Sequence, residues 1–332
     1  MQAYIIRRLI TGVFILFILS LVVFLLLRIA PGDPANLRCG LDCPPERRAA
    51  IHAALGLDKP YFPISIDFTR ASVVAFSGDS QYGSWMVDVV TGDLGVSTFN
   101  GQPVLDALKQ RLPVTLELLI ITMLVTVAAG IPFGIISALF RNSPPDFAVR
   151  IVAVLWLAVP SFWIATLVLF IPLELWGYAP PLGRTVDFFD NPWDNLRQFI
   201  PPAIVLGLAS AAGVMRLTRS SLLEVMRTDY IRTAQSKGLR DTVVVGRHAL
   251  KNSLIPVVTV IGLQVSALLG GTVIIEQIFA LPGLGQYILQ SLIVKDFPVV
   301  QTMTLYAGVA VVLMNLLVDI SYAWLDPRIR YA

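Results

Sequence analysis

Six long apolar stretches constrain this chain more than any other feature of its sequence. At about 1.5 Å per residue, a helix needs roughly 20 apolar residues to cross the hydrocarbon core of a bilayer. The stretches are 9–28, 115–140, 151–175, 200–217, 257–279 and 302–325. Because backbone groups find no water partners in lipid, such stretches must be helical. The sequence therefore predicts an all-α polytopic membrane protein with six transmembrane helices.

The composition supports the membrane class. Hydrophobic residues make up 56% of the chain and charged residues 14%, whereas soluble domains carry about 25% charged residues. The net charge of +3 is too small to indicate a nucleic-acid partner. Arg7 and Arg8 precede the first stretch as in a signal peptide. That stretch exceeds the roughly 7–15 residues of a secretory signal, and Pro31 is a poor cleavage context, so we expect a retained helix.

Lysine and arginine are concentrated on one side of the predicted helices. The inner set is Arg7, Arg8, Arg141, Arg150, the basic segment 219–251, Arg328 and Arg330, and the short outer loops hold Arg184, Arg197 and Lys295. Short loops rich in Lys and Arg stay in the cytoplasm. Both termini are therefore predicted to be cytoplasmic.

The stretches divide the chain into four parts. These are an N-terminal transmembrane helix 1–30, an extracytoplasmic segment 31–110, a five-helix core 111–326 with a cytoplasmic loop 218–256, and a cytoplasmic tail 327–332. Pro132, Pro160 and Pro172 lie inside predicted spans. Neighbouring helices in a bundle re-satisfy the carbonyls that proline frees, so we expect kinks rather than breaks.

The cytoplasmic loop carries the most informative pattern. Asp229 is positioned to cap a helix over 230–237, Gly238 to end it, and Asp241 to cap a second helix. Two short helices joined at a glycine form a compact projection. One interpretation is an amphipathic hairpin on the lipid headgroups. The other is a docking element for a soluble partner.

This loop resembles the cytoplasmic coupling motif of ABC-importer permeases, in the variant of the dipeptide/oligopeptide/nickel family. The general motif is Glu-Ala-Ala, three residues, Gly, and a later Ile-x-Leu-Pro. The chain reads DYIRTAQSKGL over 229–239 and RHALKNSLIP over 247–256. It keeps Ala234 and Gly238. It has Arg232 and Thr233 in place of Glu-Ala, and HALK over 248–251 in place of Ile-x-Leu-Pro, departures that are usual in the peptide branch.

The resemblance continues along the chain. The matching segments are RLPVTLEL over 111–118, Arg141-Asn142-Ser143 with Asp146, Gly270-Gly271 with Glu276, LPGLG over 281–285, DFPVVQ over 296–301 and DPRIRY over 326–331. Segment 29–99 matches only in outline. The order and spacing of the segments together are highly specific.

The resemblance implies a type I ABC-importer permease fold with a cytoplasmic coupling helix. The chain would form half of the translocation path for dipeptides, oligopeptides or a related small solute. Its partners would be a second homologous permease, two ABC ATPases, an extracytoplasmic solute-binding protein and the lipid bilayer of a bacterial or archaeal plasma membrane (cell inner membrane). The chain has no G-x-x-x-x-G-K-[ST] loop. It is therefore expected to be no enzyme and to bind no cofactor, with ATP and Mg in the partner ATPases.

The resemblance also assigns residues to the contact with the ATPases. They are Asp229, Tyr230, Ile231, Arg232, Thr233, Ala234, Lys237, Gly238, Leu239, His248 and Asn252. Ala234 is small enough for close docking, and Arg232, Lys237 and Arg240 are suited to acidic residues on the partner. For His248 a packing or capping role is favoured over a proton relay.

Charge in or beside a span marks a functional candidate by default. Glu117 and Glu276 are therefore candidates for the translocation path or its gating, with a structural pair or a headgroup contact as the alternative. Gly270 and Gly271 are candidates for the same path, although close helix packing is favoured.

Two cysteines lie in the extracytoplasmic segment. A local Cys39–Cys43 disulfide is the favoured interpretation, ahead of two free thiols. A zinc site with His52 lacks an evident fourth ligand, so no metal is predicted.

Two other classes compete with the importer. A self-sufficient secondary transporter or channel would be expected to show internal repeats or mid-membrane coupling carboxylates, and neither is evident. A membrane enzyme would be expected to show motifs such as HExxH or GxSxG, which the sequence lacks.

Overall fold

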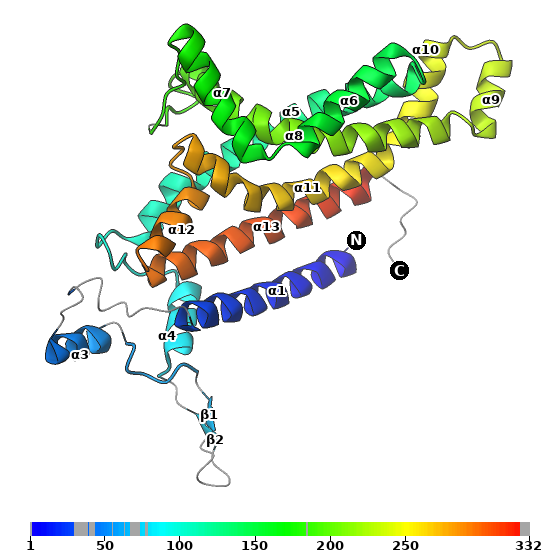
Figure 1. Ribbon diagram of the computed structural model, residues 1–332. Coiled ribbons are helices and arrows are strands. Elements are labelled where there is room, and N and C mark those ends of the chain that lie inside the picture. Colours follow the sequence, from blue (N-terminus) through cyan, green and yellow to red (C-terminus); the bar gives the residue numbers. More distant parts are fainter. Residues whose placement is uncertain are drawn as a thin grey trace. The chain divides into compact units, whose positions relative to one another are not determined.

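The computed structural model describes residues 2–29, 39, 44–54, 56–62, 64–66, 74–76, 79–183 and 185–325. Helices dominate these residues (Figure 1). The chain forms two compact units. The first contains 1–11, 112–286 and 310–332, and the second contains 12–111 and 287–309.

Four helices are long and apolar enough to cross a membrane. The candidate spans are Ile6–Ile29, Val104–Leu139, Pro192–Val225 and Phe297–Val318. Two further pairs meet the same test but are bent, Pro144–Ala158 with Ser161–Trp176 and Asp241–Val265 with Ala267–Ile278. By length and composition the described chain therefore has four candidate spans, or six if each bent pair counts as one.

The prediction of a kink at Pro160 is wrong, because the helix breaks there. Helix α6 (Pro144–Ala158) ends two residues before proline, and α7 (Ser161–Trp176) begins after it at an angle of 101°. Val159 is extended, with φ −92° and ψ 129°. Proline removes a helical N–H and disfavours helical geometry in the preceding residue. Pro132 and Pro172, in contrast, lie inside continuous helices.

The core of the first unit lies where α5 (Val104–Leu139), α8 (Pro192–Val225) and α11 (Leu250–Ile278) pack together. Its buried apolar side chains include Leu118, Phe199, Val265 and Ile275. Helices α5 and α8 approach closely at glycines. A Cβ on Gly207 would lie 2.9 Å from the carbonyl oxygen of Thr122. Small residues allow such contacts between membrane helices.

The second unit contains α3 (Pro45–Ala54), α4 (Gln81–Thr91) and parts of α1 (Gln2–Ile29), α5, α12 (Leu284–Ile293) and α13 (Phe297–Leu325). It also contains a short antiparallel hairpin of β1 (Ile64–Ile66) and β2 (Val74–Phe76), which the all-α prediction did not include. Arg28 donates to Gln301 Oε1 at 2.7 Å and to Gln81 Oε1 at 3.2 Å. These bonds tie α1, α4 and α13 together.

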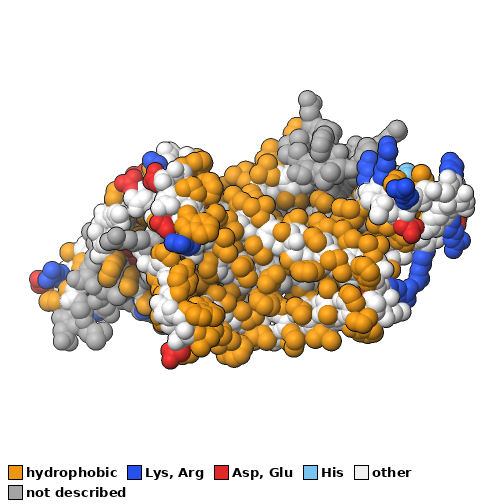
Figure 2. Space-filling model, turned by 90° about the horizontal axis from the view of Figure 1, so that it is seen from above, with side chains coloured by type: hydrophobic (Ala, Val, Ile, Leu, Met, Phe, Trp, Pro, Cys, Tyr) orange, Lys and Arg blue, Asp and Glu red, His pale blue; other side chains and the backbone are white. Residues whose placement is uncertain are grey.

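Apolar side chains cover much of the described surface. Figure 2 shows one broad apolar face, with Lys and Arg gathered at its right-hand end, where α9 (Asp229–Ser236) and α10 (Asp241–Val243) lie in Figure 1. Val152, Leu155 and Leu175 on α6 and α7 are 60%, 59% and 65% exposed. Patches of this kind on soluble proteins mark contacts with partners or membranes, and here they suit lipid or another membrane helix.

Candidate functional site

The predicted loop 218–256 begins as a continuation of α8, which runs to Val225. A short turn leads into α9 (Asp229–Ser236). Thr228, not Asp229, is the N-cap residue, with φ −76° and ψ 154°. Asp229 is instead the first helical residue, where its carboxylate complements the helix dipole. An Arg232 nitrogen lies 3.5 Å from its oxygen.

Gly238 directly follows the C-cap residue of α9, as its position in the sequence predicted. Its φ is 76°, a left-handed conformation that glycine adopts without a steric penalty. The Gly238 N–H donates to the carbonyl of Gln235 at 2.9 Å. The chain then turns toward α10 (Asp241–Val243), and the left-handed conformation of Gly238 makes this turn possible.

One side of α9 is buried within the chain. Ile231 is fully buried and Ala234 is 8% exposed. Both belong to a cluster with Leu222 of α8, Val244 and Ala249. That the small side chain of Ala234 serves docking to a partner stays a prediction. Ala234 allows α9 to pack closely against its own chain.

The opposite side of α9 is open. We call the exposed residues Asp229, Tyr230, Arg232, Thr233, Lys237 and Leu239 the α9 face. Tyr230 and Leu239 are 43% and 39% exposed. Exposed aromatic and aliphatic side chains among charges are typical of a protein contact surface.

The chain after α9 is continuous with a predicted span. Asp241 is again the first helical residue rather than the cap, which is Arg240. A π-helical segment η1 (Val244–Ala249) follows and leads directly into α11. It contains His248, which is half-buried. Short π-helical segments inside α-helices are frequent at functional sites.

Two hydrogen bonds connect this region to its neighbours. The Asn252 side-chain amide donates to the Tyr230 hydroxyl at 2.8 Å. The Ser221 hydroxyl donates to the carbonyl of Ser253 at 2.8 Å. Together with the buried cluster, they join α9 to α8 and to the start of α11.

A buried ion pair supports the end of α8. The Asp146 carboxylate is fully buried and accepts two hydrogen bonds from Arg219, at 3.1 and 3.0 Å. It also accepts from the Ser137 hydroxyl and the Asn142 N–H. Such bidentate pairs are among the strongest side-chain interactions. In the sequence, Asp146 is grouped with Arg141-Asn142-Ser143 but not with Arg219, because nothing in the spacing of the two residues indicates the contact.

The two predicted carboxylates have structural partners. Glu117 is half-buried and accepts from the Asn195 amide at 2.7 Å. Glu276 is fully buried and accepts from the Thr115 hydroxyl at 2.7 Å and from the Gln286 N–H at 2.8 Å. Glu276 thereby fixes the turn between α11 and α12 against α5.

Gly270 and Gly271 lie on an exposed part of α11, and a Cβ on either residue would meet nothing within 4 Å. Within the described chain they therefore do not allow close helix packing. Of the predicted disulfide pair, Cys43 lies outside the described residues.

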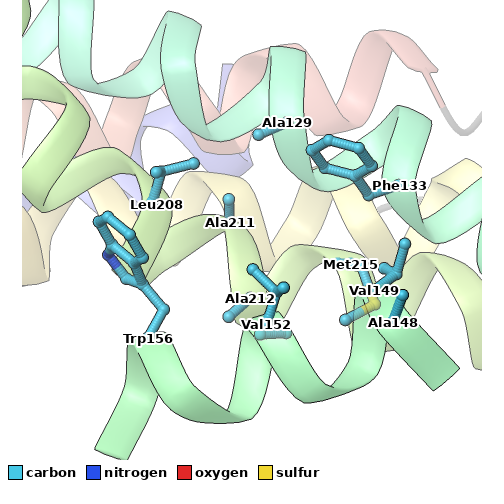
Figure 3. Close-up of a pocket in the computed structure, with 11 residues that line it drawn as sticks. Ala129, Phe133, Ala148, Val149, Val152, Trp156, Leu208, Ala211, Ala212 and Met215 are labelled. Atoms are coloured by element: carbon cyan, nitrogen blue, oxygen red, sulfur yellow. The ribbon is translucent and has the colours of Figure 1, made fainter. Parts of the chain in front are cut away.

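A hollow of about 220 Å³ lies between α5, α6 and α8 (Figure 3). Its walls include Phe133, Trp156, Leu208 and Met215, and all of its lining side chains are apolar. None of the predicted site residues lines it. A hollow without polar side chains suits an apolar occupant better than a peptide.

Comparisons with known proteins converge on one family. Residues 130–331 match the model described as binding-protein-dependent transport system inner membrane component, and residues 1–119 match that of its N-terminal part. The dipeptide transport system permease protein DppB of Alkalihalophilus pseudofirmus is 37% identical, with 100% of both chains covered. The oligopeptide transport system permease protein AppB of Bacillus subtilis is 36% identical, again with 100% of both chains covered.

A solved structure of the MetNI methionine ABC transporter in inward-facing conformations has a similar fold. The TM-score is 0.53 at 16% identity, covering 68% of this chain and 98% of that chain. The likeness concerns the fold alone.

Proposed function

The chain belongs to the family of binding-protein-dependent transport system inner membrane components, and on this premise we propose that it forms half of the translocation path of a peptide importer. It is a permease subunit of an ABC importer rather than a catalytic subunit. Membership of this family implies ATPase and binding-protein partners. Two relatives at 37% and 36% identity over the full chain are permeases of dipeptide and oligopeptide transport systems, which favours peptides as the solute.

The finer architecture is part of the proposal. Each bent pair, α6 with α7 and the two parts of 241–278, counts as one span, which gives six. The Lys and Arg distribution favours cytoplasmic termini. A second homologous permease and two ATPases complete the complex. Segment 31–110 is extracytoplasmic, and the five-helix core spans 111–326 with the coupling loop 218–256.

One observation carries the coupling mechanism: α9 is buried on one side and open on the other. A partner that binds the α9 face transmits its movement through Ile231 and Ala234 to Leu222 of α8 and Val244 of η1. The Asn252–Tyr230 bond adds a second link to α11. Helices α8 and α11 contribute to the core of the permease. A movement of α9 that displaces them would therefore shift the translocation path between its inward-facing and outward-facing states.

The carboxylates and glycines take different roles in this proposal. Glu276 has donors on both of its oxygens, which favours a role in holding the outer turn rather than contact with solute. Gly270 and Gly271 are exposed on a helix of the core. We assign them to the contact with the second permease, where small residues let helices approach closely.

The test is co-purification of the tagged chain with its partners from mild-detergent membranes. Leu239→Asp places a charge on the α9 face, and Phe189→Asp, at a residue that is 91% exposed on the predicted outer side, is the matched control. We expect wild type and the control to retain the ATPases and the first variant to lose them.

Uptake of a labelled dipeptide into vesicles separates the importer from the alternative. An importer requires ATP and the binding protein. If the chain purifies alone and still supports uptake without ATP, the proposal fails and a self-sufficient secondary transporter takes its place.

A further inference from the structure

Five arginines surround two adjoining hollows between α6 and the end of α8. One hollow is lined by Arg150, Arg216 and Arg219 together with apolar residues. The other is lined by Arg141, Arg150, Arg219 and Arg227 together with polar residues. The two share Arg150 and Arg219, so they form one groove. It lies at the predicted cytoplasmic ends of the spans that contain α6 and α8.

Acidic side chains neutralise only part of this charge. Asp146 lies behind the groove and is bonded to Arg219, with Arg150 at 3.9 Å. Glu224 is the one acidic residue that lines either hollow. Among the described residues, no acidic group lies within salt-bridge distance of Arg141, Arg216 or Arg227, and all three are exposed. The groove therefore has an excess of positive charge.

The groove is apolar on its other side. Ile151, Val154 and Leu155 follow Arg150 on α6 and are 58%, 58% and 59% exposed. They share one side of the helix and line the same hollow as Arg150, Arg216 and Met215. Aliphatic side chains that begin directly beside an arginine cluster match a molecule with an anionic end and a hydrocarbon end.

We propose that this groove binds an anionic phospholipid of the inner leaflet. The arginines hold the phosphate, and Ile151, Val154 and Leu155 contact the first part of an acyl chain. Basic pockets between membrane helices on the cytoplasmic side are typical sites for such headgroups. An acidic surface of an ATPase would match the arginines but leave the aliphatic wall uncovered, so the lipid accounts for more of the groove.

The test is native mass spectrometry of the purified full-length chain with added dioleoyl phosphatidylglycerol or dioleoyl phosphatidylcholine. The variant is Arg216→Gln with Arg227→Gln, which removes two exposed charges and leaves the Asp146–Arg219 pair intact. Arg197→Gln is the control, because Arg197 is a half-exposed arginine near the other end of the same helix. Thermal unfolding in detergent verifies that all variants are folded.

Each arginine near a membrane surface contributes about 1 kcal/mol toward anionic lipid. We therefore expect the affinity for phosphatidylglycerol to fall roughly tenfold or more in the double variant and to stay unchanged in Arg197→Gln. Phosphatidylcholine should bind weakly to all three proteins. Dihexanoyl phosphatidylglycerol should bind wild type more weakly than the dioleoyl lipid, because it covers less of the aliphatic wall.

Three results would overturn the lipid site. They are equal phosphatidylglycerol binding by the double variant and wild type, equal binding of both headgroups by wild type, and a double variant that keeps the lipid but loses the ATPases during purification. The last result would assign the arginines to a protein interface instead.

Discussion

A Cβ atom on Gly283 would overlap the carboxyl carbon of Glu276. The turn after α11 can close over this carboxylate only because residue 283 has no side chain. Gly285 is similarly tight, with its Cβ position 2.7 Å from Val273 Cγ2. Both glycines of the LPGLG segment are therefore required because the side chains of Glu276 and Val273 leave no room for a Cβ atom at positions 283 and 285.

Gly283→Ala is expected to destabilise the protein by roughly 1–3 kcal/mol, because overpacking moves either the turn or the carboxylate. Thermal unfolding in detergent measures the effect. Gly270→Ala is the control, since a Cβ there meets nothing within 4 Å. Equal melting temperatures for Gly283→Ala and wild type would contradict the close packing.

Asp146→Asn is expected to lower the stability by about 3 kcal/mol, because it leaves Arg219 without its buried counter-charge. The amount of chain in the membrane should fall with it. Asp229→Asn removes an exposed pair with Arg232, in which the Asp229 side chain is 97% exposed, and should cost about 0–1 kcal/mol. The melting temperature of Asp146→Asn should be clearly lower than that of Asp229→Asn. Equal melting temperatures for the two variants would contradict the stabilising role of the buried pair.

Tyr230→Phe and Asn252→Ala are expected to act as one change. Each removes the same 2.8 Å bond, which contributes about 0.5–1.5 kcal/mol. ATP-driven uptake measured for both single variants and the double variant forms a double-mutant cycle. If the bond links the two residues, the double variant should take up the labelled peptide hardly more slowly than either single variant. Fully additive losses would show that the bond carries no coupling.

Stability should decline at alkaline pH through Tyr287. Burial, and then the negative charge of Asp296, raise the pKa of its hydroxyl above the unfolded value of about 10. A raised pKa means that the folded state holds the proton more tightly. Its stabilising contribution is therefore complete below about pH 10 and is lost as the pH rises through the folded-state pKa.

Melting temperatures between about pH 9 and 12, compared for wild type and Tyr287→Phe, test this prediction. The variant should lose less stability across the range. Tyr178→Phe, at a residue that is 45% exposed, should follow wild type. If the melting temperatures of all three proteins fall in parallel as the pH rises, Tyr287 is not the cause of the loss of stability.

The sequence predicted the helices well because length and apolar content determine them. Each of the six apolar stretches is largely helical, with 151–175 divided between α6 and α7, and Gly238 has the left-handed conformation that its position indicated. Pro160 was misjudged because Pro132 and Pro172 occupy similar sequence settings and remain helical. Whether proline kinks or breaks a helix depends on packing partners, which are not visible in the local sequence.

The sequence indicated which segment forms the candidate site, but not which side chains of that segment are exposed. The motif identified 229–239, yet it did not distinguish the buried Ile231 and Ala234 from the exposed Tyr230 and Leu239. That division depends on Leu222, Val244 and Ala249, which come from other helices. The Asp146–Arg219 pair was missed for the same reason, since its members are 73 positions apart in the sequence.

The π-helical segment 244–249 holds one residue more than an α-helix would use over the same path. Return of this segment to α-helical geometry would turn everything N-terminal to it by about 100° relative to α11 and shift it by about 1.5 Å along the axis. The junction between the cytoplasmic projection and its span thus contains one extra helical residue. Deleting Gly246 would remove the extra residue, so the segment would become α-helical while the α9 face kept its present direction.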